Sequence, residues 1–179
     1  MDTLRQHAET IMADALKSAL PDEAVRQALL DAPFREGGDV VLVAVGKAAF
    51  RMAQAAAQAL GGRVSRGIVI TKYGHAEGGI PGLKVREAGH PVPDANTLSA
   101  TREALDMVRG LKEQDTVLLL VSGGGSALFE DPLIPLEELA DVTGQMLRSG
   151  ADIVEMNTVR KRLSGVKGGR FALACAPAS

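Results

Sequence analysis

The sequence predicts an α/β fold: a Rossmann-like, open and mainly parallel sheet with helices on both faces, plus N-terminal helices. Two observations support this prediction. Apolar runs rich in β-branched residues largely alternate with helical patterns along the chain, which is the order of elements in α/β proteins with right-handed crossovers. The run at residues 39–46, DVVLVAVG, shows no polar alternation, as expected of a strand covered on both faces. At 179 residues, the chain has the length of one ordinary domain.

Two helices are expected before the first strand. Apolar residues recur at three- and four-residue spacing through the first twenty residues, and Pro21 ends this amphipathic helix. A second, short helix begins near Asp22 and carries Val25 and Leu29 before a segment rich in turn-forming residues.

The remaining elements follow from the same patterns. Four strands are predicted within residues 39–46, 66–74, 83–94 and 115–125. Helices are predicted over residues 48–60, from Leu98 to Leu111, over 136–148 and over 151–164. The final segment, RFALACAPA followed by Ser179, is still apolar, and we therefore expect the sequence to stop just before another strand.

Composition excludes several classes of function. The formal charge of −2 and the pI near 5.9 argue against general nucleic-acid binding, and the absence of Trp removes stacking platforms. The single cysteine, Cys175, cannot form an internal disulfide and is expected to act as a small hydrophobe. We expect no membrane span and a cytoplasmic location. The oligomeric state stays open, with a homo-oligomer among the alternatives.

Polar residues follow each predicted strand, and in a parallel sheet they would meet at the edge where α/β proteins bind ligands. These residues are Lys47, then Lys72 and His75, then His90 and Asp94, and finally Ser122 to Ser126. Lys47 begins a helix, where the helix dipole disfavours a cation by a few tenths to about 1 kcal/mol. A bound phosphate or carboxylate would offset this cost, and the alternative is a solvated lysine. His90 is either a packed loop residue or a site residue, and Asp94 is either a site residue or an N-cap.

The stretch LLLVSGGGSALFEDP, residues 118–132, runs from a strand into three glycines flanked by serines. Glycines let backbone N–H groups approach a ligand closely, and the ligand suited to bare N–H groups is an anion. We expect Ser122, Gly123, Gly124, Gly125 and Ser126 to contact it. The alternative is a tight strand-to-helix turn that Ser126 caps.

A second cationic stretch lies near the C-terminus. In NTVRKRLSGVKGGR, residues 157–170, five cations occur without an acid. Helical geometry places Ile153, Met156, Val159 and Leu163 on one apolar stripe and Asn157, Arg160, Lys161 and Ser164 on one polar arc. The polar arc can meet one ligand, with Lys167 following in a glycine-rich loop. A solvated basic face is the alternative.

Five ordered motifs together resemble the N-terminal part of the type II glycerate kinases, the glycerate 2-kinase family whose C-terminal half carries a MOFRL domain. The motifs are VAVGKAAFRMA, GIVITKYGH, AGHPVPD, VSGGGSALFEDP and NTVRKRLSGVKGGR. The resemblance implies that residues 1–179 form a partial Rossmann-like domain. The MOFRL domain would be absent from this chain, and with it the expected magnesium ligands.

The same resemblance implies a reaction and roles for residues. ATP and Mg²⁺ would serve to phosphorylate D-glycerate in a cleft between two domains. Lys47 and Arg160 would be active-site residues, and the 122–126 loop would contact substrate or phosphate, with His90, Asn157, Lys161 and Lys167 as further candidates. Phosphoryl transfer asks a protein mainly for positioning and charge neutralisation, which cations and N–H donors supply.

Two other functions remain open at this stage. A nicotinamide-dependent hydroxypyruvate reductase would need the G-x-G-x-x-G fingerprint, which the segment around Lys47 lacks, as it also lacks a P-loop. A catalytically inactive anion-binding module would use the same loops at the ends of the strands.

Overall fold

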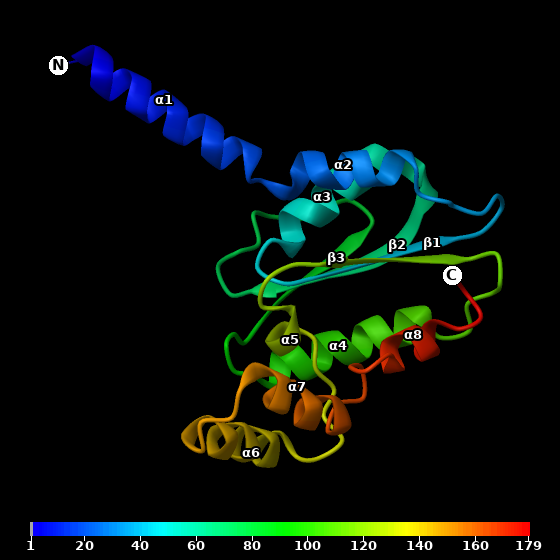
Figure 1. Ribbon diagram of the computed structural model, residues 1–179. Coiled ribbons are helices and arrows are strands. Elements are labelled where there is room, and N and C mark those ends of the chain that lie inside the picture. Colours follow the sequence, from blue (N-terminus) through cyan, green and yellow to red (C-terminus); the bar gives the residue numbers. More distant parts are fainter. Residues whose placement is uncertain (1) are drawn as a thin grey trace.

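The computed structural model describes residues 2–179 and confirms the predicted α/β fold (Figure 1). The helices before the sheet are α1 (Asp2–Ser18) and α2 (Pro21–Leu30). The sheet region holds β1 (Val40–Val45), α3 (Ala49–Leu60), the 3₁₀ turn η1 (Gly61–Arg63), β2 (Val64–Lys72), β3 (Leu83–Ala88), α4 (Ala95–Val108) and β4 (Thr116–Val121). The last elements are α5 (Gly125–Leu128), α6 (Leu136–Arg148), α7 (Ile153–Arg162) and α8 (Arg170–Cys175).

The four strands form one parallel sheet in the order β3-β2-β1-β4. β1 lies inside the sheet, pairs with β2 and with β4, and is buried along its whole length. This burial explains why its sequence is apolar at every position. The parallel arrangement brings the residues that follow all four strands to one edge of the sheet.

Helices cover both faces of the sheet, with α2 and α3 on one side and α4 and α8 on the other (Figure 1). Two apolar clusters fill these layers. The first includes Val41, Val43 and Phe171, and the second includes Leu42, Ala44 and Phe50. Cys175 is buried in the first cluster, which confirms its expected role as a small hydrophobe.

The strand order changes direction at β1. From β1 the chain moves to β2 and β3 on one side, and then returns to place β4 on the other side. The loops after β1 and β4 therefore meet at a topological switch point, which is where open α/β sheets bind their ligands.

The final segment differs from the rest of the sheet region. RFALA begins a short helix, α8, which packs against α4. Beyond this helix, the Ser179 N–H donates to the Asp115 carbonyl at 3.1 Å, and the Val117 N–H donates to the Ser179 carbonyl at 2.8 Å. The last residue of the sequence thus pairs with the outer edge of β4.

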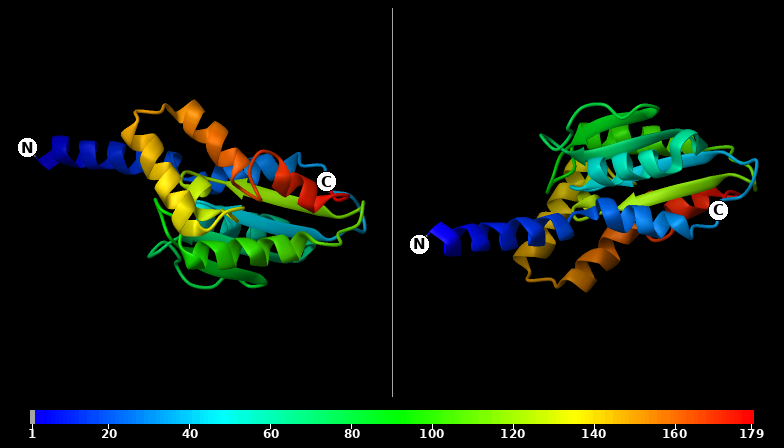
Figure 2. Two further views of the ribbon diagram at one scale, coloured as in Figure 1. Left: turned by 90° about the horizontal axis from the view of Figure 1, so that it is seen from below. Right: turned by 90° about the horizontal axis from the view of Figure 1, so that it is seen from above.

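Helix α1 projects away from the sheet and its covering helices in all three views (Figures 1 and 2). The structure confirms the helix that was predicted here from periodic apolar residues. Four of these residues are nevertheless exposed: Leu4, Ile11, Met12 and Leu16. The amphipathic pattern is therefore present without a buried face.

Helix α7 is shorter than predicted. It begins at Ile153 and ends at Arg162, so Ser164 lies outside it and forms an isolated bridge with Pro132. None of its residues is fully buried, and Ile153 and Val159 of the expected apolar stripe are exposed. The polar arc drawn from helical geometry therefore cannot extend to Ser164.

Candidate functional site

The loops that follow β1 and β4 are joined by hydrogen bonds. The Lys47 N–H donates to the Gly123 carbonyl at 2.9 Å, and the Ala48 N–H donates to the Ser122 hydroxyl at 3.0 Å. Gly46 adopts φ +120°, and a Cβ there would lie 2.2 Å from Ser122 Oγ. A side chain at position 46 would therefore separate the two loops.

Three predicted residues converge beside the glycines of the 122–126 loop. Gly124 adopts φ +90°, and a Cβ on it would lie 2.9 Å from the His90 ring and 3.4 Å from Lys47 Cγ. Lys47 and His90 thus both lie next to Gly124. His75 joins this group, because its Nδ1 lies 3.1 Å from the Lys47 carbonyl oxygen.

The glycine loop also presents free donors. Within residues 2–179, the N–H groups of Gly123 and Gly124 donate no hydrogen bond, whereas the Gly125 N–H donates to the Ser122 carbonyl at 3.2 Å. Unpaired N–H groups beside a lysine are suited to an anion.

A cavity of about 340 Å³ lies beside the same loop. Five of the predicted site residues line it: Gly125, Ser126, Asn157, Lys161 and Lys167. Gly168 and six apolar residues complete its lining, namely Val45, Leu119, Val121, Phe129, Val166 and Phe171. The glycine loop and the cationic stretch, separated by more than thirty residues in sequence, therefore form one pocket.

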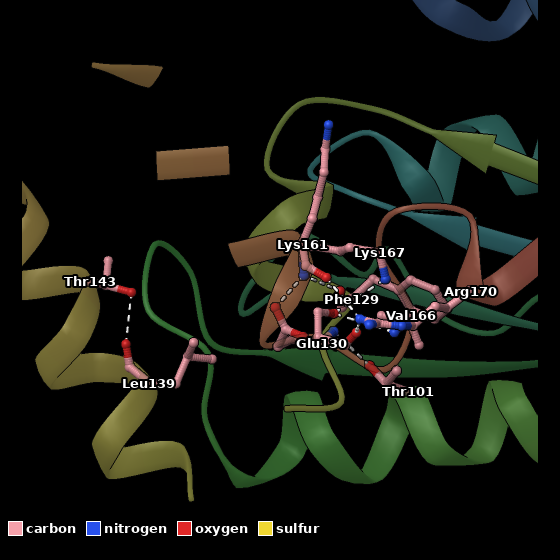
Figure 3. A network of polar contacts seen from close by, with 10 residues as sticks. Thr101, Phe129, Glu130, Leu139, Thr143, Lys161, Val166, Lys167 and Arg170 are labelled. Atoms are coloured by element: carbon pink, nitrogen blue, oxygen red, sulfur yellow. Dashed lines mark hydrogen bonds and ion pairs between the residues drawn. The ribbon is translucent and has the colours of Figure 1, made fainter. Parts of the chain in front are cut away.

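The two lysines of this cavity differ in their surroundings. Lys161 is exposed and extends away from Glu130 (Figure 3). Lys167 is largely buried, and its Nζ donates to the Phe129 carbonyl at 3.0 Å and to the Glu130 carboxylate. Burial lowers the pKa of Lys167, and the nearby Arg160 charge lowers it further, while Glu130 opposes both effects.

Arg160 and Ser164 do not line the cavity. The Nε of Arg160 is buried and has no hydrogen-bond partner among the described residues. Ser164 is fully buried, and its hydroxyl accepts from the N–H groups of Val166 at 3.3 Å and Lys167 at 3.2 Å. Ser164 therefore shapes the turn that carries Lys167.

Residues 129–133 hold this turn in place. The Gly165 N–H donates to the Asp131 carbonyl at 2.7 Å, and the Leu133 N–H donates to the Leu163 carbonyl at 2.8 Å. Asp131 is itself paired with Arg102 of α4 at 2.9 Å. The cationic stretch is thus attached to the segment that directly follows the glycine loop.

The structure decides two of the alternatives at individual residues. Asp94 is the N-cap of α4, since its carboxylate accepts from the Thr97 N–H at 2.9 Å, and its Oδ2 also accepts from the Tyr73 hydroxyl at 2.7 Å. Ser126 does not cap the turn, because Gly124 occupies the N-cap position of α5. Ser126 instead lies at the cavity.

The described residues form neither a metal-binding cluster nor a helix that could span a membrane. Among residues 2–179, no three His, Cys, Asp or Glu side chains converge in a group that could hold a metal ion. These residues alone do not fit a magnesium centre. No helix in the described part of the chain has the length and hydropathy needed to cross a membrane.

Glu130, the partner of Lys167, is a functional candidate that none of the sequence patterns indicates. It is fully buried, which is unusual for an acid. A signal was present in SALFEDP, where the acid directly follows a run of apolar residues, but only the fold shows which cation it meets.

Comparison with known proteins gives one matching family model, described as Domain of unknown function (DUF4147), over residues 7–179. The chain is 51% identical over 179 residues to "D-glycerate 2-kinase" of Thermotoga maritima, covering 99% of this chain and 42% of that protein. It is 41% identical over 180 residues to "Glycerate 2-kinase" of Pyrococcus horikoshii, covering 94% and 40%.

A solved structure agrees with these similarities. The crystal structure of a glycerate kinase from Thermotoga maritima matches with a TM-score of 0.91 and 50% sequence identity, covering 100% of this chain and 43% of that chain. The chain spans about two fifths of the length of the curated relatives it matches.

Proposed function

The chain belongs to the DUF4147 family, and we propose that it supplies one side of the cleft in which a glycerate 2-kinase phosphorylates D-glycerate. In the proposed reaction, a glycerate hydroxyl oxygen forms a bond to the γ-phosphorus of ATP. The bond between that phosphorus and the β-γ bridging oxygen breaks, the hydroxyl proton is released, and ADP leaves.

One observation carries the proposal more than any other. Ser126, Asn157, Lys161 and Lys167 line one cavity at the switch point of the sheet, directly beside the glycine loop. A phosphoryl group in transfer spreads negative charge over its oxygens, and cations with N–H donors held in fixed positions stabilise that charge. The cavity offers the cations, and the adjacent glycine loop offers the N–H donors.

Lys47 and His90, which lie at the glycine loop outside the cavity lining, have a related role in this proposal. Lys47 lies next to Gly124, so its ammonium can reach an anion that the free N–H groups of Gly123 and Gly124 bind. His90 borders the same place. Arg160 lies on α7 outside the cavity lining, and in this proposal its planar guanidinium is suited to bind the glycerate carboxylate.

The proposal assigns the remaining parts of the site to other residues of the protein. When bound, magnesium would supply positive charge that offsets the charge of the ATP phosphates. Since residues 2–179 do not bring together the ligands for such an ion, we assign its ligands and the facing wall to a second domain of the MOFRL type. A cytoplasmic location, where ATP is available, belongs to the same proposal.

The test is turnover by the complete gene product. Purified protein incubated with Mg²⁺, D-glycerate and ATP labelled at the γ-phosphate should transfer the label to glycerate, and omission of D-glycerate should abolish the labelled product. Oxidation of NADH with hydroxypyruvate should be absent. Reductase activity without label transfer would replace the kinase assignment with an oxidoreductase.

A further inference from the structure

Glu130 is a buried carboxylate that no sequence motif marked as functional. Its side chain is 0% exposed, its Oε2 accepts from Lys167 Nζ, and its Oε1 has no hydrogen-bond partner within residues 2–179. A buried charge persists only when it is paired, so the positions of Glu130 and Lys167 depend on each other.

The pairing leaves one donor of Lys167 unused. A lysine ammonium carries three N–H groups. One donates to Glu130 and a second to the Phe129 carbonyl at 3.0 Å, while Lys167 also belongs to the lining of the cavity beside the glycine loop. The third N–H has no acceptor within residues 2–179, which leaves it for a ligand.

Glu130 is itself fixed to the core. Its backbone N–H donates to the Thr101 hydroxyl at 3.1 Å, and Thr101 is a fully buried residue of α4 (Figure 3). The backbone of Glu130 is thus anchored to α4, which limits the movement of its carboxylate. A rigid partner sets the direction of the Lys167 ammonium, which a solvated lysine would lack.

Charge balance gives the carboxylate a second effect. Arg160 and Lys161 lie on α7 next to Lys167, and Arg160 disfavours the protonated form of Lys167. Glu130 neutralises the charge of Lys167, while Lys161 of the cavity lining has no acidic partner among the described residues. The cavity lining therefore keeps a net positive charge, which favours an anion.

We propose that Glu130 is a positioning residue, which holds Lys167 so that its third N–H binds an oxyanion of the reacting molecules. The inference rests on the proposed function. The oxyanion is either a phosphate of ATP or the carboxylate of D-glycerate, and the two differ in which substrate binds less well when Lys167 is misplaced.

The test uses the complete gene product and the variants Glu130→Gln, Lys167→Met and the double variant. Glu130→Gln keeps the shape of the side chain and removes its charge. Because a small displacement of a binding group can cost up to about 100-fold, we expect KM for one substrate to rise about 10- to 100-fold. The substrate whose KM rises, ATP or D-glycerate, is the one that carries the oxyanion. We expect kcat to change less than KM.

The double variant separates positioning from a merely structural role. If Glu130 acts through Lys167, the double variant should have the same KM as Lys167→Met alone. Glu103→Gln is the matched control, because Glu103 is also ion-paired, with Lys84 and Arg86, and lies away from the cavity. Its KM values should equal those of the wild type.

Two results would overturn the inference: unchanged KM values in Glu130→Gln, or effects of the two substitutions that multiply in the double variant. A wild-type protein without glycerate phosphorylation would instead refute the proposed function. In that event, titration with inorganic phosphate decides on Glu130 separately. The ¹⁵N-labelled Lys167 ammonium signal should then shift in the wild type and in Glu103→Gln, and a shift of equal size in Glu130→Gln would overturn the role.

Discussion

The backbone N–H of Lys47 donates to the carbonyl of Gly123 at 2.9 Å, which ties the loop after β1 to the loop after β4. These strands are neighbours in the sheet but are separated by about seventy residues of sequence. The bond places a lysine beside the N–H groups of Gly123 and Gly124, which donate to no acceptor among the described residues. The proposed anion site depends on this local contact.

Gly124→Ala is predicted to destabilise the packing of the glycine loop against the loop after β1. Gly124 has φ +90°, and a methyl group there would lie 2.9 Å from the His90 ring. Left-handed backbone alone costs a non-glycine residue about 1–2 kcal/mol, so we expect a loss of at least that size in the free energy of unfolding, measured in urea. Gly123→Ala is the control, since a Cβ there meets only Lys47 Cε at an ordinary 3.8 Å. Equal stability of the two variants would contradict the described loop.

The two serines of the glycine loop should separate stability from activity. Ser122→Ala removes the acceptor for the Ala48 N–H before α3, and loss of one such hydrogen bond costs about 0.5–1.5 kcal/mol. Ser126 lines the cavity, and its hydroxyl is exposed rather than capping a helix. We expect Ser126→Ala to unfold at the wild-type urea concentration but to have a lower kcat/KM. The reverse pattern would exchange their roles.

Asp94→Ala is predicted to lower stability in a pH-dependent way. Partial burial favours a raised pKa for Asp94, but the hydrogen bonds from Tyr73, Thr97 and Gly89 outweigh it and lower the pKa below its ordinary value of 3.8. A carboxyl with a lowered folded-state pKa stabilises the fold above its unfolded-state pKa, and that stabilisation is lost as pH falls through the folded-state pKa.

The measurement compares urea unfolding of the wild type and Asp94→Ala at pH 7 and at about pH 3. The difference should be about 1 kcal/mol at pH 7, as for loss of an N-cap, and smaller at the acidic pH. Asp106→Ala serves as the control, because Asp106 is an exposed residue paired only with its neighbour Arg109. A difference for Asp94 that grows toward acid would contradict the assigned contacts.

Lys161→Ala should weaken the reaction without weakening the fold. Lys161 is exposed and lines the cavity, so its removal takes a positive charge from the site and little packing from the core. Loss of one group that stabilises developing charge costs about 100- to 1,000-fold in rate, and we expect a fall in kcat/KM of at least tenfold. Arg162→Ala, on the same helix and outside the cavity lining, should retain wild-type kinetics. Equal losses in the two variants would indicate a general charge effect.

The sheet, and the edge that carries the candidate site, could be predicted from the sequence because buried parallel strands consist of continuous apolar, β-branched residues. DVVLVAVG shows no alternation, and β1 is indeed covered on both faces. Once the strands are parallel, Lys47 and Gly124 must lie at the same edge. Among the five predicted residues that line the cavity, Gly125 and Ser126 follow from the same argument. Asn157, Lys161 and Lys167 were predicted instead from the cationic stretch and from the resemblance of the motifs.

Other features needed the fold. Helical periodicity placed Ser164 beside Asn157 and Lys161, but α7 ends at Arg162, and the chain then turns so that Ser164 is buried. Glu130 was overlooked because burial of an acid depends on a cation that arrives from a distant segment. Periodicity at α1 likewise indicated an apolar face, whereas only the tertiary arrangement shows that this face is exposed.

The central claim is that the glycine loop, Lys47 and the cationic stretch form one anion site. The most direct measurement is the position of the bound phosphates in a crystal structure of the complete gene product with a non-hydrolysable ATP analogue and D-glycerate. We predict phosphate or carboxylate oxygens about 2.7–3.2 Å from the N–H of Gly123 or Gly124 and from the ammonium of Lys161 or Lys167. Both ligands bound away from these residues would contradict the claim.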